Sequence, residues 1–133
     1  MTRCVVDASV AVEYLLRTPV GLTVAGMLES AVLLAPELLD AEVLSVLRRA
    51  VLQRRLAEAR TLQAIEDLIH WPVERIPHRA LAPLAWQYHQ NLSAYDAFYV
   101  ATARVHDLPL LTADARLARA TGLGIAVQFV RVG

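Results

Sequence analysis

The chain has 133 residues, of which 56% are apolar and 20% charged, and thirteen acidic residues balance thirteen basic ones. This composition predicts one globular domain over residues 1–133 and excludes an intrinsically disordered chain. Every basic residue is an arginine, which excludes chemistry that needs a lysine, such as Schiff-base formation. Because the chain has one cysteine and no apolar run near 18 residues, we expect a cytoplasmic protein that does not span a membrane.

Helical and extended segments alternate along the chain. Apolar periodicity, proline and glycine predict helices over residues 10–17, 20–30, 36–54, 58–70, 78–90, 93–106 and 115–121, the third with Pro36 in its first turn. Short apolar runs predict strands over residues 3–6, 31–35, 73–77, 108–112 and 125–132. Strands that are apolar throughout and separated by helices indicate a parallel sheet covered on both faces. We therefore predict a three-layer α/β/α fold with a central parallel sheet.

Two aspartates follow predicted strands. Asp7 comes directly after strand 3–6, and Asp114 lies two residues after strand 108–112. In a doubly wound parallel sheet, the loops at the carboxyl ends of the strands meet at one edge, where binding sites form. Asp114 also has the position of a helix N-cap. Asp7 has no such structural explanation, because Ser9 is available as the cap of the helix that follows.

Two further acids lie on predicted helices. Asp96 follows Ser93 at the spacing of a capping box, which is a structural reason for its presence. Glu42 lies beside the buried stripe of its helix, with Leu38 and Val46 one turn away on either side. A carboxylate in such a place needs a partner, a proton or a cation.

The four acids together predict a metal site. If they converge to about 5 Å, each like-charged pair costs on the order of 3 kcal/mol at an effective dielectric constant of about 20. Either a divalent cation or raised pKa values of the acids would offset this repulsion. Oxygen ligands alone suit Mg²⁺ or Mn²⁺ rather than zinc, and the four histidines show no ligand spacing with these acids.

Four segments spread over nearly the whole chain carry a resemblance to a known family. They are VVDASV at 5–10, APELLDAEVLSVL at 35–47, LSAYDAFYVATAR at 92–104 and LPLLTADARLA at 108–118. In order and separation they are similar to the PIN-domain proteins, specifically the VapC-type toxins of bacterial toxin–antitoxin pairs.

The resemblance implies a single PIN-like nuclease domain and a Mg²⁺- or Mn²⁺-dependent endoribonuclease. It also implies an acidic quartet of Asp7, Glu42, Asp96 and Asp114, with Asp7 and Asp96 as the most direct metal ligands. Ser9 and Thr112 would be polar neighbours of the metal. The partners implied are an RNA substrate, a VapB-type antitoxin that fills an apolar groove formed by residues 20–70, and a second copy in a homodimer, with higher assembly on the antitoxin.

Arginines near the acids are candidates for contacts with RNA phosphates. Arg116 and Arg119 are favoured because the helix that carries them begins at the predicted site. The aromatic residues are expected to serve mainly in the core, although Tyr95 and Tyr99 lie one turn apart beside Asp96.

Two alternatives to a nuclease are considered. Asp7 at the end of a first strand also suits an aspartyl-phosphate enzyme, but a dehalogenase-like phosphatase needs an aspartate where Ser9 stands, and a receiver domain needs a lysine. The second alternative is a catalytically inactive PIN fold that serves as a protein-interaction module. Four clustered acids argue against it, because a scaffold gains nothing from their repulsion.

Overall fold

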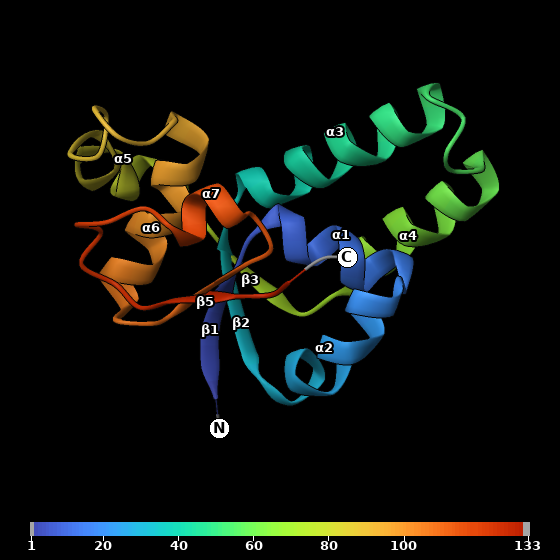
Figure 1. Ribbon diagram of the computed structural model, residues 1–133, viewed down its shortest axis with the longest axis horizontal. Coiled ribbons are helices and arrows are strands. Elements are labelled where there is room, and N and C mark those ends of the chain that lie inside the picture. Colours follow the sequence, from blue (N-terminus) through green and yellow to red (C-terminus); the bar gives the residue numbers. More distant parts are fainter. Residues whose placement is uncertain (1, 132–133) are drawn as a thin grey trace.

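Residues 2–131 are described by the structure, a computed structural model with alternating strands and helices (Figure 1). The strands are β1 (Arg3–Val6), β2 (Val32–Pro36), β3 (Val73–Ile76), β4 (Leu110–Thr112) and β5 (Val127–Phe129). The helices are α1 (Ala8–Leu16), α2 (Pro19–Ser30), α3 (Leu38–Leu52), α4 (Glu58–His70), α5 (His78–Trp86), α6 (Ala94–His106) and α7 (Ala115–Ala118).

The strands form one parallel sheet in the order β3-β2-β1-β4-β5. Val5 of the central strand β1 pairs with Leu34 of β2 and Leu110 of β4, and all three side chains are fully buried. Helix α1 contacts α2, α3 and α4, α3 contacts α4, and α5 contacts α6 (Figure 1). Right-handed crossovers place these two groups on opposite faces of the sheet. The predicted three-layer α/β/α fold is confirmed, and its strand order reverses beside β1.

The buried apolar side chains form one continuous cluster around β1 and β4. Within residues 2–131, no helix is both long enough and apolar enough to cross a lipid bilayer.

Several boundaries differ from those predicted. Pro36 is the last residue of β2, paired with Ile76, and not part of the first turn of α3. Proline has no N–H to donate. The N–H of the next residue, Glu37, donates a hydrogen bond to the Ile76 carbonyl at 3.0 Å. Helix α5 ends at Trp86, before turns at 87–91, and α7 has only four residues. Strand β5 covers 127–129 of the predicted 125–132, of which residue 132 lies outside the described part.

Helix α2 closely approaches the end of α1 because residue 21 is glycine. A Cβ atom on Gly21 would lie 1.9 Å from the Glu13 carbonyl oxygen. The same carbonyl accepts a hydrogen bond from the Thr18 N–H at 3.2 Å, and Arg17 between them has a left-handed φ of 55°. This tight turn fixes the angle at which α2 leaves α1.

We predict opposite effects for two glycine-to-alanine changes in α2. Gly21→Ala should lower the free energy of unfolding by about 3 kcal/mol, because its methyl group overlaps the α1 backbone. Gly26→Ala is the matched control, since nothing lies within 4 Å of its Cβ position. It should raise the free energy of unfolding by about 0.5–1 kcal/mol through helix propensity. Urea denaturation measures both, and a stabilising effect at Gly21 would contradict the observed contact.

Candidate active site

Asp7 stands at the carboxyl end of β1 with both of its carboxylate oxygens engaged. Oδ1 accepts hydrogen bonds from the Ser9 hydroxyl at 2.5 Å and the Val10 N–H at 3.2 Å. Oδ2 accepts one from the Thr112 hydroxyl at 2.5 Å. The side chain is buried, with 6% of the residue exposed. Asp7 itself is therefore the N-cap of α1, and the expectation that Ser9 fills this role is wrong: Ser9 donates to the cap instead.

Ser9 and Thr112 tie the ends of the neighbouring strands β1 and β4 together. The Ser9 hydroxyl accepts a hydrogen bond from the Ala113 N–H at 2.8 Å, and the Thr112 hydroxyl accepts one from the Asp114 N–H at 3.0 Å. Each hydroxyl thus accepts from the β4–α7 loop and donates to Asp7. Because Thr112 is completely buried, this arrangement is shielded from water on that side.

Glu42 enters the same region from the second turn of α3. Its Oε1 atom is buried and has no hydrogen-bond partner in residues 2–131. Burial raises the pKa of Glu42; the nearby Tyr99 hydroxyl opposes this rise, and the charges of Asp96 and Asp7 add to it. Burial also raises the pKa of Asp7, against the hydrogen bonds that it accepts and with a further contribution from the charge of Asp96. Asp7, Glu42 and Asp96 are therefore electrostatic neighbours.

Asp96 and Asp114 are joined by an arginine. The Arg116 Nη2 atom lies 2.9 Å from Oδ2 of Asp96 and 3.3 Å from Oδ2 of Asp114. Both aspartates lie at helix starts: Asp96 donates its N–H to the Ser93 hydroxyl, as the capping-box spacing predicts, and Asp114 caps α7. The Arg116 side chain is 68% exposed, so this bridge lies at the mouth of the site.

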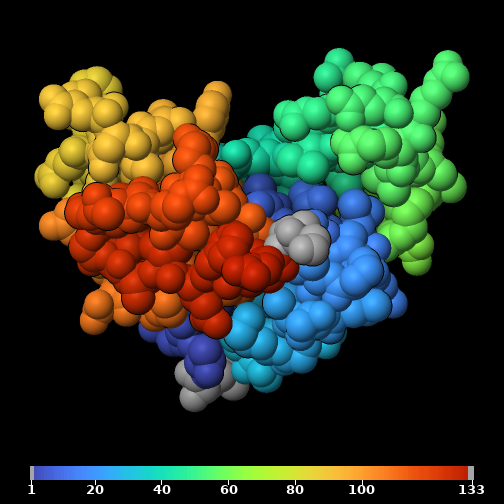
Figure 2. Space-filling model, in the orientation of Figure 1, coloured from blue at the N-terminus to red at the C-terminus, as the bar shows by residue number. Residues whose placement is uncertain are grey.

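The acids come from elements on two sides of a notch in the molecule. Figure 2 shows it between the lobe that carries α5, α6 and α7 and the arm formed by α3 and α4. Beside Glu42 lies a hollow of about 310 Å³ that is also lined by Leu38, Ala41, Ser45 and the exposed Tyr95. The hollow gives the acidic region an opening onto the surface.

The donor chemistry of this region suits a hard divalent cation. All candidate ligands are carboxylate or hydroxyl oxygens. The buried Oε1 atom of Glu42 accepts no hydrogen bond from a described residue. In the arrangement seen for residues 2–131, however, no group of three or more Asp, Glu, His or Cys side chains is placed to hold a metal ion. Arg116 instead supplies positive charge to two of the acids. The metal ion itself remains a prediction.

Two features of the site go beyond the sequence interpretation. Arg116, expected to contact phosphate, pairs with two of the acids, whereas Arg119 at the end of α7 forms no salt bridge within the described residues. Tyr99, expected in the core, is indeed buried but brings its hydroxyl to Glu42. Its position one turn after Asp96 was the available signal for the second feature.

Comparisons with known proteins agree over nearly the whole chain. The PIN domain family model matches residues 4–123. Ribonuclease VapC1 of Mycobacterium tuberculosis is 41% identical over 133 residues, which cover 98% of this chain and 100% of that protein.

Two solved structures share the fold. PAE2754 from Pyrobaculum aerophilum has a TM-score of 0.70 at 20% identity, covering 95% of this chain and 83% of that one. VapBC-5 from Mycobacterium tuberculosis, a member of the VapBC family of toxin–antitoxin systems, has a TM-score of 0.58 at 21% identity, covering 99% and 100%. The family model and the close relative together show that this chain belongs to the PIN-domain family and, within it, to the VapC-type proteins.

Proposed function

We propose that the protein is a Mg²⁺- or Mn²⁺-dependent endoribonuclease, the toxin of a bacterial toxin–antitoxin pair. The observation that supports this proposal is that Asp96 acts electrostatically on both Asp7 and Glu42 near the carboxyl edge of the sheet, where Oε1 of Glu42 is buried without a partner among the described residues. The relative VapC1 is named a ribonuclease, and it matches this chain along its full length.

In the proposed site, Asp7 and Asp96 would hold the cation, with Glu42 and Asp114 beside them. When bound, the cation would activate a water molecule and stabilise charge on the phosphodiester oxygens. Ser9 and Thr112 fix both oxygens of Asp7, since each donates a hydrogen bond of 2.5 Å. Such fixed orientation is the main contribution that a protein makes to this kind of reaction. Attack by water would leave 5′-phosphate and 3′-hydroxyl ends.

We predict that the purified protein cuts total cellular RNA into discrete fragments with Mg²⁺ or Mn²⁺ and not with EDTA. Asp7→Asn and Asp96→Asn should abolish the fragments, because each removes a carboxylate charge from the site. Asp107→Asn is the matched control: Asp107 caps α6 with a φ of 53°, which asparagine also tolerates. Sequencing the fragment ends identifies the cleavage motif, and cyclic phosphate ends would contradict the water mechanism.

Cleavage that persists in both variants would point to a contaminating nuclease. A melting experiment separates the remaining outcomes, because a ligand that binds only the folded state raises the melting temperature. Mn²⁺ should raise the melting temperature of the wild type and not that of Asp7→Asn. An inactive wild type that Mn²⁺ does not stabilise would favour the inactive interaction module.

Arg116 gives a second prediction, because its guanidinium pairs with Asp96 and Asp114 and would compete with a cation for them. Arg116→Ala should bind Mn²⁺ several-fold more tightly than the wild type in a calorimetric titration. Arg119→Ala, on the same short helix but without a salt bridge to a described residue, should leave the Kd unchanged. An unchanged Kd for Arg116→Ala would mean that the bridge does not compete with the cation.

The same two arginines remain our candidates for contacts with RNA phosphates. The measurement uses an Asp7→Asn background, in which cleavage is expected to be lost. Replacing both arginines with alanine should make the slope of log binding constant against log salt concentration shallower, by the equivalent of about two released counterions. If this slope of log binding constant against log salt is unchanged, the two arginines do not contact RNA phosphates.

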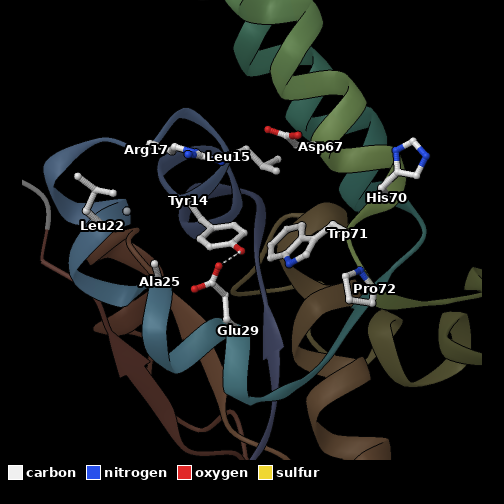
Figure 3. Close-up of a pocket in the computed structure, with 11 residues that line it drawn as sticks. Tyr14, Leu15, Arg17, Leu22, Ala25, Glu29, Asp67, His70, Trp71 and Pro72 are labelled. Atoms are coloured by element: carbon white, nitrogen blue, oxygen red, sulfur yellow. Dashed lines mark hydrogen bonds between the residues drawn. The ribbon is translucent and has the colours of Figure 1, made fainter.

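We further propose that a VapB-type antitoxin binds the hollow of about 470 Å³ between α1, α2 and the end of α4 (Figure 3). Tyr14 and Trp71 stack there with ring centroids 5.0 Å apart, and Leu22 is 62% exposed. Polar and charged side chains surround this apolar floor: Arg17, Glu29, Asp67 and His70. Such a surface suits the apolar face of an amphipathic segment.

Leu22→Glu should therefore weaken binding of the cognate VapB-type antitoxin, because it places a charge on the apolar floor. Val105→Glu is the control, since Val105 is 57% exposed on α6, which does not line this hollow. Co-expression followed by titration of the purified partners measures both, and equal affinities would place the antitoxin elsewhere. The homodimer and any higher assembly with antitoxin remain predictions that sedimentation velocity over a range of concentrations tests.

A further inference from the structure

Tyr99 carries a buried hydroxyl group that the fold does not use. The residue is 2% exposed, and its hydroxyl oxygen is buried without a hydrogen-bond partner in the described residues. Oε1 of Glu42 is in the same condition, and Nη1 of Arg60 is the one other such side-chain atom in residues 2–131. Buried polar atoms without partners are rare in native proteins, so each one calls for a physical reason.

Two of these three atoms are neighbours. The Tyr99 hydroxyl and the Glu42 carboxylate act on each other's pKa, and the Ala8 backbone and the charge of Asp7 act on the same hydroxyl, so these groups are neighbours. The hydroxyl and the buried Oε1 atom of Glu42 nevertheless form no hydrogen bond of regular geometry with any described residue. The Tyr99 hydroxyl therefore faces the acidic region between the start of α1 and the start of α3. A phenol has one proton to donate, whereas an ionised carboxylate only accepts. The two groups are chemically complementary.

We propose that Tyr99 is a positioning residue for Glu42: its hydroxyl donates a hydrogen bond to the buried Oε1 atom and thereby orients the carboxylate toward the cation. This inference rests on the proposed metal-dependent function. Groups that orient the ligands of a metal typically change its affinity about 10- to 100-fold when removed. Burial, followed by the charge of Glu42, raises the pKa of Tyr99, so the hydroxyl keeps its proton at neutral pH.

A purely structural role for Tyr99 makes a different prediction. If the ring only fills the core, phenylalanine would pack as well and would remove an unsatisfied buried group. Tyr99→Phe would then leave both the melting temperature and metal binding intact. The proposed positioning role instead predicts an intact or higher melting temperature in EDTA, together with weaker metal binding.

Tyr88→Phe is the matched control. Tyr88 is also buried, at 5% exposure, but its hydroxyl donates to the Leu123 carbonyl at 2.6 Å and accepts from Arg104 at 3.1 Å, away from the acids. Removing this bonded hydroxyl should lower the melting temperature by several degrees and leave Mn²⁺ affinity unchanged. The two variants thus separate loss of stability from loss of metal binding.

The experiment is a calorimetric titration of Mn²⁺ into the wild type, Tyr99→Phe, Tyr88→Phe, Glu42→Gln and the double variant Tyr99→Phe/Glu42→Gln. We expect the Kd of Tyr99→Phe to rise about tenfold or more. In the Glu42→Gln background the same change should have little further effect, because the hydroxyl acts through Glu42. A wild-type Kd in Tyr99→Phe, or an equal loss in both backgrounds, would overturn the inference.

A wild type that does not bind Mn²⁺ would overturn the metal-dependent function as well, so the two failures are distinguishable. If Tyr99→Phe does not fold, a measurement without any change at position 99 decides. Addition of Mg²⁺ should shift the tyrosine absorption band of Tyr88→Phe as in the wild type, and Glu42→Gln should lose this shift. A shift of equal size in Glu42→Gln would count against the proposal.

Discussion

Like-charged carboxylates held at one edge of a parallel sheet are the constraint on which the rest of the site depends. Because β1 and β4 are parallel neighbours, the residues that follow them, Asp7 and Asp114, reach the same edge. Helices α3 and α6 bring Glu42 and Asp96 to it from the flanks. Asp7 follows the buried central strand and is itself buried, so its charge is largely removed from water, whereas Asp96 and Asp114 lie nearer the surface.

The fold handles each of these charges differently. Asp7 receives three neutral hydrogen-bond donors, two of them hydroxyls held in turn by backbone N–H groups. Asp96 and Asp114 share a guanidinium, and Glu42 has no donor for its buried oxygen. Burial still raises the pKa values of Asp7 and Glu42 despite these contacts. Perturbed carboxyls grouped in this way are more typical of functional sites than of structural ones, which agrees with the proposed function.

The sequence was informative wherever a pattern has one physical solution. Apolar strands between helices require a covered parallel sheet, and this requirement places Asp7 and Asp114 together before any coordinates are known. The sequence led to a wrong prediction where two residues suit one role. Ser9 and Asp7 both suit the N-cap of α1. Asp7 fills this role because Thr112, 105 residues away in the sequence, lies beside it in the fold. Pro36 likewise suits a helix start or a strand end. The pairing of β2 with β3 selects the second, and no local signal contains that information.

The acids of the site are stabilised by two kinds of group, neutral hydroxyls at Asp7 and a guanidinium at Asp96 and Asp114. Ser9 and Thr112 are neutral donors to Asp7; Thr112 is completely buried and Ser9 is half-buried. Arg116 is charged and 68% exposed, and its ion pairs contribute little to stability. Its planar fork reaches two carboxylates at once. Asp7 is therefore held by neutral hydroxyls, whereas Asp96 and Asp114 are held by an exposed charge, the one that a cation would replace in the proposed function.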